Sequence, residues 1–169
     1  MKIFIAADHA GYELKKALIE DITFSGATVI DCGATDYNEN DDYPLIIQIA
    51  AQAVSEAESA RLAGGAEYTD GEVRGIVIGG SGQGEAIVAN KFPHIRTTVY
   101  YGGVQEIITL SREHNDSNVL SLGARFISEN EAIMAVRLWL GTQFSQEDRH
   151  VRRIDQIEEI EGRVKDTLY

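Results

Sequence analysis

The sequence has little that would cross-link a fold or anchor it to a membrane. Cys32 is the one cysteine among 169 residues, which excludes an intrachain disulfide framework and a zinc site built on several cysteines. No apolar run reaches the ~18 residues that a membrane-spanning helix needs. The N-terminus also lacks the apolar core of a secretory signal peptide. These absences predict a protein of the cytoplasm.

Basic residues are scarce as well, with 15 Lys and Arg against 27 Asp and Glu, and the formal net charge is −12 at pH 7. Such a charge repels nucleic acid and acidic membranes, so neither is expected as a partner. The four histidines are scattered along the chain without the spacing of metal ligands, so no metal site is expected. An ordinary share of hydrophobic residues, 44%, indicates one globular domain over residues 1–169.

Short apolar runs alternate with helical patterns along the whole chain. The alternation predicts an α/β fold in which a five-stranded parallel sheet is covered by helices on both faces. A small, polar segment at 59–74 is expected to be an exposed insertion. Strands are predicted at 3–7, 27–30, 75–79, 95–100 and 119–123, and helices at about 12–24, 43–58, 85–92, 103–112, 129–141 and 146–164.

A glycine-rich loop, GGSGQGE at 79–85, follows the third predicted strand and precedes a helix. Glycines let several backbone N–H groups converge on one anion, and Glu85 places a carboxylate at the edge of the loop. The loop is neither a dinucleotide fingerprint nor a P-loop, because Glu85 stands where those motifs need a glycine or a lysine. An anion hole beside a base suits enolisation, although a tight turn without a ligand remains an alternative.

Other polar groups stand near the predicted strand ends. Asp8 and His9 follow the first strand and could bind sugar hydroxyls or move protons, but Asp8 could simply cap the next helix. His114 closes a helix, where a histidine often only caps the helix C-terminus.

Arg149 and Arg153 share one helical face and could clamp a phosphate, or they could pair with neighbouring acidic residues, which are Glu147, Asp148 and Asp155. Cys32 is interpreted as an inert, packed side chain.

Together these stretches resemble the type B ribose-5-phosphate isomerase family, which includes the galactose-6-phosphate isomerase subunits. The resemblance implies a Rossmann-like three-layer α/β/α sandwich and reversible aldose–ketose isomerisation of a sugar phosphate without metal or organic cofactor. It also implies a homo-oligomer, a dimer or a tetramer, whose active site is built across two subunits. The matching stretches, in family order, are 7–11, 31–33, 42–44, 79–91, 112–116, 123–125 and 149–155.

The sequence departs from many members of that family at one position. Those members have a cysteine immediately before the G-[ST]-G turn, and this cysteine is their catalytic base. Gly79 occupies that position here. The chain instead resembles a second subgroup with the pattern G-G-S-G-x-G-E, whose base is the glutamate, and the match falls on Glu85.

The resemblance also implies roles for individual residues. Glu85 would move the proton between C2 and C1 through a cis-enediolate, backbone N–H groups of 80–84 would hold the oxyanion, and Ser81 would move a proton between O1 and O2. His114, assisted by Asp8, would open the sugar ring. Arg149 and Arg153 of a neighbouring subunit would grip the phosphate with His9. Substrate contacts are expected from His9, Tyr43, Gly80, Gly82, Gln83, Gly84, Asn115, Arg125, Arg149, His150 and Arg153.

Two rival functions remain open at the level of sequence. One is an isomerase of a six-carbon sugar phosphate, such as allose 6-phosphate, because the sequence does not fix the depth of the pocket. The other is a non-catalytic module that binds or senses a sugar phosphate. This alternative stays open because the chain lacks the cysteine that is the catalytic base in many members of the family.

Overall fold

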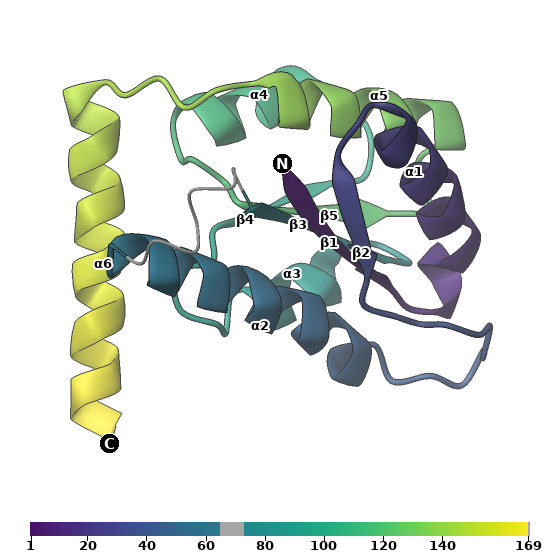
Figure 1. The fold of residues 1–169 in the computed structure, drawn as a ribbon, viewed down its shortest axis with the longest axis horizontal. Helices are drawn as coiled ribbons and strands as arrows, with labels where there is room; N and C mark the ends of the chain where they lie inside the picture. The colour runs from purple at the N-terminus through teal and green to yellow at the C-terminus, as the bar shows by residue number, and fades with distance from the viewer. Residues whose placement is uncertain (65–72, 169) are drawn as a thin grey trace.

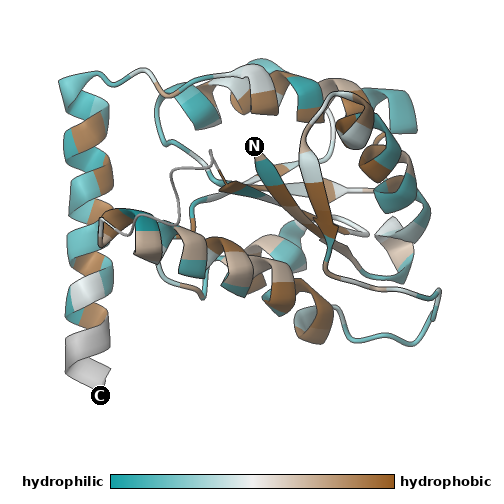
Figure 2. Cartoon of the chain, in the orientation of Figure 1, coloured by the Kyte–Doolittle hydropathy of each residue, from teal (hydrophilic) through white to brown (hydrophobic). Residues whose placement is uncertain are grey.

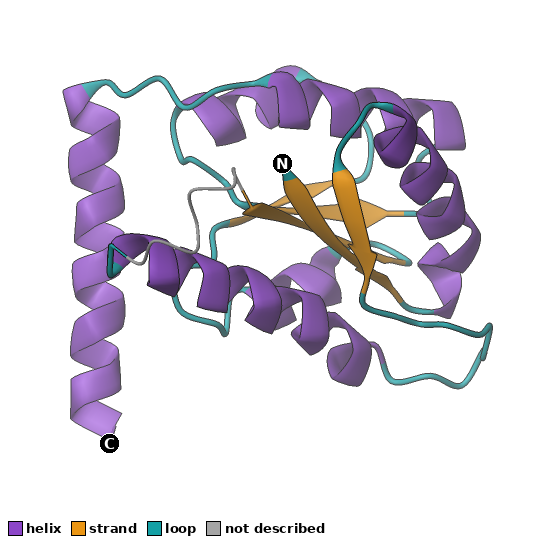
Figure 3. Cartoon of the chain, viewed as in Figure 1, coloured by secondary structure: helices purple, strands orange, loops and turns teal. Residues whose placement is uncertain are grey.

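The computed structural model describes residues 1–64 and 73–168, with side chains as far as Val164. A five-stranded, all-parallel sheet with the strand order β2-β1-β3-β5-β4 forms its centre (Figure 3). The elements are β1 (Lys2–Ala7), the 3₁₀ turn η1 (His9–Gly11), α1 (Tyr12–Phe24), β2 (Thr28–Asp31), α2 (Tyr43–Leu62), β3 (Val73–Gly79), α3 (Gln83–Ala89), β4 (Thr97–Tyr100), α4 (Glu106–Glu113), β5 (Val119–Gly123), α5 (Glu129–Gly141) and α6 (Asp148–Leu168).

Helices cover both faces of the sheet, as the alternation predicted (Figure 1). Helices α1, α4 and α5 pack on one face, and α2 and α3 pack on the other. Along β3, Ile76 and Ile78 enter the core under α1 and α5, whereas Val77 enters the core under α2. This alternation follows from the two-residue period of a strand. The Rossmann-like three-layer α/β architecture is therefore confirmed.

Helix α6 stands apart from the sandwich, beyond the end of the sheet where the strands begin (Figure 1). It is mainly hydrophilic, with separate hydrophobic bands (Figure 2). Three apolar side chains on it, Ile157, Ile160 and Val164, are about half exposed. Glu158 and Glu161 hold the helix to the body by accepting hydrogen bonds from the ring and the backbone N–H of His94. An amphipathic helix with this much apolar surface uncovered has a face suited to a further partner.

The expected insertion at 59–74 is narrower than predicted. Residues 59–62 continue α2, and β3 already begins at Val73. Arg74 is only 1% exposed, because its guanidinium donates to the carbonyl of Trp139 at 2.8 Å and packs 5.1 Å from the Trp139 ring. Because a charged residue is normally exposed, the sequence pattern assigned Arg74 to the polar segment and not to the start of β3. The middle of the expected insertion, 65–72, lies outside the described residues.

Other predicted boundaries shift by a few residues. Helix α3 begins at Gln83 rather than at Glu85, which places Glu85 inside its first turn. Helix α4 begins at Glu106 rather than at residue 103, because Gly102 and Gly103 have φ values of +105° and +97° that a right-handed helix cannot contain. Helix α6 spans Asp148–Leu168 rather than 146–164. Within the described ranges, no helix combines the length and apolarity needed to cross a membrane.

Candidate active site

The glycine-rich loop lies at the C-terminal ends of the central strands, the edge at which open α/β sheets bind their ligands. The loop is tied to the chain after β5, since Gly79 O accepts from Ala124 N at 2.8 Å and Gly80 O accepts from Arg125 N at 3.1 Å. Its turn requires glycine at 82, where φ is +76° and an added Cβ would lie 3.0 Å from the Leu122 backbone. The loop is thus packed closely onto β5 and held in one shape.

Glu85 is 4% exposed, and its carboxyl group lies directly over Gly79. A Cβ added at Gly79 would stand 2.0 Å from Glu85 Oε1. Burial is the main cause that raises the pKa of Glu85, and the charge of Asp8 raises it further, while hydrogen bonding from the Glu85 and Gly82 backbone acts in the opposite direction. A carboxylate with a raised pKa is a stronger base, which suits proton abstraction near neutral pH.

Asp8 is buried at the end of β1 and caps η1. Its Oδ1 accepts from the N–H groups of Ala10 and Gly11 at 2.9 and 3.2 Å. The alternative prediction, that Asp8 caps the helical turn after the first strand, is therefore confirmed. Asp8 is still close enough to Glu85 for its charge to raise the pKa of that carboxyl, so it also belongs to the site.

His9 is bound by an acidic residue that the sequence did not single out, Asp41. The ring Nδ1 lies 2.6 Å from Asp41 Oδ1, and the His9 backbone N–H donates to Asp41 Oδ2 at 2.8 Å. This hydrogen bond is the main cause that raises the pKa of His9. Several acidic residues crowd the segment 31–42, and nothing in the sequence distinguishes Asp41 from the others.

Two further predicted residues lie against the loop backbone. A Cβ added at Gly84 would be 2.7 Å from Tyr43 Oη, and one added at Gly80 would be 3.2 Å from Arg125 Cζ. The charge of Arg125 also lowers the pKa of His9, so the Arg125 guanidinium lies near the His9 ring. The structure thus gathers around this loop the predicted residues Asp8, His9, Tyr43, Gly80, Ser81, Gly82, Gln83, Gly84, Glu85 and Arg125.

The remaining predicted residues form a second group near α6. His114 ends α4, and its ring centroid lies 4.1 Å from that of His150 in α6. His150 is buried, and its Nδ1 lies 2.8 Å from Ser145 Oγ. Burial, followed by the charge of His114, lowers the pKa of His150. The other members, Asn115, Arg149 and Arg153, are exposed.

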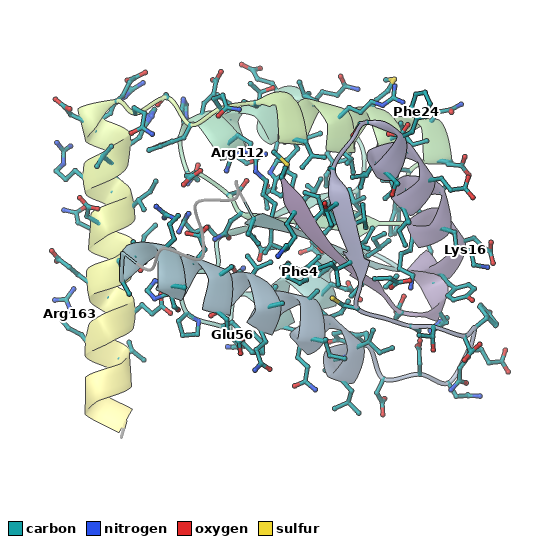
Figure 4. The ribbon with its side chains drawn as sticks, viewed as in Figure 1. Phe4, Lys16, Phe24, Glu56, Arg112 and Arg163 are labelled. Carbon is teal, nitrogen blue, oxygen red and sulfur yellow. The ribbon has the colours of Figure 1, made fainter. Side chains whose placement is uncertain are left out.

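The turn after α4 fixes the position of His114. Arg112, labelled in Figure 4, is 2% exposed and donates to Asp116 Oδ1 at 2.8 Å and to Ser117 O at 2.6 Å. Arg149 donates to Glu147 Oε2 at 2.8 Å, so the predicted alternative of local pairing with an acidic neighbour is observed for this arginine.

The two groups lie at opposite ends of the sheet in a single chain. His114 precedes the first residue of β5, whereas the glycine loop packs on its last residues. The five residues of β5, at about 3.3 Å each, separate the two ends by at least about 13 Å. The sequence-based pairing of His114 with Asp8 is therefore not formed within one chain, because α4 runs antiparallel to the strands and delivers His114 to the edge where they begin.

Within the described residues, two clusters have donor types that metals use, and their ligand atoms lie within 4.8 Å of one another. They are Asp8, His9 and Asp41, and His94, Glu158 and Glu161. In the first cluster, hydrogen bonds occupy Nδ1 of His9, both Asp41 oxygens and one Asp8 oxygen. In the second, His94 Nδ1 lies 2.5 Å from Glu158, and Arg96 supplies positive charge 3.4 Å from the same carboxylate. Both are better described as hydrogen-bonded networks.

A parallel three-layer fold with a glycine loop, a buried carboxylate and cationic side chains at one sheet edge defines a Rossmann-like protein with a site for a small anionic ligand. The family model described as Ribose/Galactose Isomerase matches residues 3–157. The chain therefore belongs to the ribose/galactose isomerase family, in agreement with its motifs.

Individual relatives agree with the family model. The chain is 40% identical over 162 residues to "Ribose-5-phosphate isomerase B" of Escherichia coli (strain K12), covering 96% of this chain and 97% of the relative. Identity to the protein of that name from Mycobacterium tuberculosis (strain H37Rv) is 39% over 161 residues, with 95% and 90% covered.

Solved structures show the same likeness. The ribose-5-phosphate isomerase B of Mycoplasma genitalium, with bound ribulose-5-phosphate, matches with a TM-score of 0.84 and 32% identity over 95% of this chain and 96% of that one. The Clostridium thermocellum protein of the same name matches with a TM-score of 0.82 and 38% identity over 97% and 99%.

Proposed function

We propose that this protein is an aldose–ketose isomerase that interconverts ribose 5-phosphate and ribulose 5-phosphate. Family membership and relatives of that name support the reaction, and one of these relatives has ribulose-5-phosphate bound. The observation that carries the assignment to this site is the buried Glu85 carboxylate, held over Gly79 at the ligand-binding edge of the sheet. Enolisation of a sugar needs a base that removes a proton and hydrogen-bond donors that stabilise the oxyanion, and a buried carboxylate beside a glycine loop offers both.

Glu85 acts as the base in this proposal. Its carboxylate takes the proton from C2 of the open-chain aldose, the C–H electron pair forms the C1=C2 bond, and the C1 oxygen receives the carbonyl electrons. The resulting cis-enediolate is reprotonated at C1 by the same carboxyl group, while Ser81 moves a proton between O1 and O2. General base catalysis of this kind contributes about 10²–10⁴-fold to a rate.

The loop backbone stabilises the charge that develops on oxygen. Backbone N–H groups of residues 80–84 would hold the oxyanion in this proposal. Their turn is packed against β5, since an added Cβ at Gly82 would lie 3.0 Å from the Leu122 backbone and Ser121 Oγ donates to Gly82 O at 2.6 Å. One preorganised donor of this kind is worth about 3 kcal/mol in the transition state. The base and one loop donor therefore lower the activation free energy by comparable amounts. In this proposal both act on the same bound sugar.

We infer further that a second copy of the chain completes each site. His9 and Arg125 lie by the loop, whereas His114, which would open the ring, lies with Arg149 and Arg153 at the far end of the same chain. Two-fold symmetry would bring the far end of one copy to the loop of the other and give two equivalent sites.

The surface around α6 supports this assembly. A groove of about 530 Å³ beside β4 is bordered by apolar side chains that include Ile107, Leu110 and Ile157. Ile160 and Val164 continue the exposed apolar surface along α6. Burying such surface favours association by about 25 cal/mol per Å² of apolar area.

Isotope exchange tests the proposed reaction. In D₂O with ribose 5-phosphate, we expect formation of ribulose 5-phosphate and deuterium at C2 of the recovered aldose, followed by NMR. Ligand binding without any exchange would contradict the proposal and favour a binding module. A higher kcat/KM on allose 6-phosphate than on ribose 5-phosphate would contradict the pentose assignment alone.

Cys32 is expected to take no part in the reaction. It is half-buried, and burial, followed by the charge of Asp31, raises the pKa of its thiol. The thiol is therefore protonated at neutral pH and is a poor nucleophile. We expect Cys32→Ser to keep kcat within about twofold of the unmodified protein, measured with ribose 5-phosphate. Loss of nearly all turnover in a folded Cys32→Ser protein would contradict the assignment of Glu85 as the base.

A further inference from the structure

We propose that Asp41 is a positioning residue that holds His9 as an imidazolium, with its Nε2–H group available to the phosphate of the substrate. The inference rests on the proposed function, because it deepens the phosphate end of that site. It assigns a role to a residue whose two carboxylate oxygens are both bound to His9.

The geometry of the pair is specific. A single carboxylate binds both the ring and the backbone of His9, through Oδ1 at 2.6 Å and Oδ2 at 2.8 Å. A carboxylate only accepts hydrogen bonds, so Nδ1 of His9 carries a proton and Nε2 is the nitrogen left for a ligand. The Asp41 side chain is 8% exposed against 25% for that of His9, which places the carboxylate behind the ring.

The segment that carries Asp41 is anchored at its base. Lys15 is 1% exposed, and its Nζ donates to both Asp31 oxygens at 2.7 and 2.8 Å and to Ala34 O at 2.7 Å. Tyr12 Oη donates to Thr35 O at 3.1 Å. These contacts explain how a residue 32 positions away in sequence reaches the ring with fixed geometry.

Three charged side chains act on the His9 ring. The hydrogen bond and charge of Asp41 and the charge of Asp8 raise the pKa of His9, whereas burial and the charge of Arg125 lower it. The edge of the Tyr37 ring is the aromatic neighbour, with centroids 6.5 Å apart. Because Asp41 is the largest contributor, its removal leaves a ring that is neutral over more of the range in which a sugar phosphate is a dianion, above about pH 6.

The test is the variant Asp41→Asn, which keeps the shape of the side chain and removes its charge. A lower pKa reduces the imidazolium fraction at any pH above both pKa values and changes it little at a pH below both of them. We therefore expect KM for ribose 5-phosphate to change little at about pH 5.5 and to rise severalfold by about pH 8, with kcat within about twofold.

A matched control is Asp36→Asn, because Asp36 is an exposed acid on the same segment. Its KM should follow the unmodified protein at every pH. An Asp41→Asn protein whose KM rises by one constant factor at all pH values would overturn the proposal, since a merely structural role would give that result.

NMR titration of the His9 ring separates this inference from the proposed function, because it needs no turnover. The His9 signals can be assigned among the four histidines with a His9→Gln variant. We expect a midpoint above the ordinary value of about 6.5 in the unmodified protein, a lower midpoint in Asp41→Asn and an unchanged midpoint in Asp36→Asn. A midpoint at or below about 6.5 in the unmodified protein, or no shift in Asp41→Asn, would overturn the role of Asp41 whatever reaction the protein catalyses.

Discussion

Replacing Glu85 by glutamine should lower kcat on ribose 5-phosphate by about 10²–10⁴-fold and leave KM within a small factor. The amide has nearly the shape of the carboxyl group but cannot accept the C2 proton. Glu85 is buried against Gly79, so the isosteric change should preserve the packing. Steady-state kinetics of the folded variant measure the effect, and near-normal turnover would exclude Glu85 as the base.

A control and a pH profile sharpen this result. Glu56, labelled in Figure 4, is exposed on α2, and Glu56→Gln should leave kcat unchanged. Since burial raises the pKa of Glu85 and only the ionised carboxylate is a base, kcat/KM should fall as the pH drops through a value above the ordinary glutamate pKa of about 4.3. In Glu85→Gln this acid limb should disappear.

Replacing Gly79 by alanine should reduce kcat almost as strongly, although no functional atom is removed. The new Cβ would lie 2.0 Å from Glu85 Oε1 and 2.1 Å from its Cδ, so the carboxyl group must move off the reacting carbons. A shift of about 1 Å in a catalytic group can cost about 10²-fold in rate. The atoms in the way belong to the end of a flexible side chain, so the variant should fold with little loss of stability.

Gly141→Ala is the matched control, because a Cβ added at Gly141 meets nothing within 4 Å. Its kcat should equal that of the unmodified protein, and thermal melts should show all three proteins folded. Normal turnover in Gly79→Ala would mean that the carboxyl group works from another position than the one seen over Gly79.

The same close approach gives a physical reason for glycine at position 79 beside the proposed base. A side chain at position 79 and the carboxyl group of Glu85 compete for one volume. Glycine at position 79 therefore leaves the volume that the Glu85 carboxyl group occupies.

Much of the fold follows from local sequence patterns. The limits of β5 and α5 agree with the predicted ranges, because an apolar strand and a helix capped by Ser128 both carry strong signals. The position of the glycine loop is also predictable, since the C-terminal edge of a parallel sheet collects its sites. That rule alone groups Asp8 and His9 with Glu85.

Two features of the site were not predicted from the residues. Asp41 reaches His9 only through the tertiary path of a segment that Lys15 anchors, and its acidic neighbours look alike in sequence. His114 lies far from Glu85 because α4 returns antiparallel to the strands. The second feature did have a signal, since a residue that ends a helix just before a strand lies at the edge where strands begin.

The most direct test of a site shared between copies is complementation. Glu85→Gln should be co-expressed with a chain that carries both His114→Gln and Arg153→Ala, each chain being nearly inactive alone. In a two-fold dimer, random mixing makes half of the dimers hybrid, and each hybrid has one intact site of two, so turnover should recover to about a quarter of the unmodified level. A mixture that stays as inactive as its separate chains, although hybrids form, would contradict the shared site.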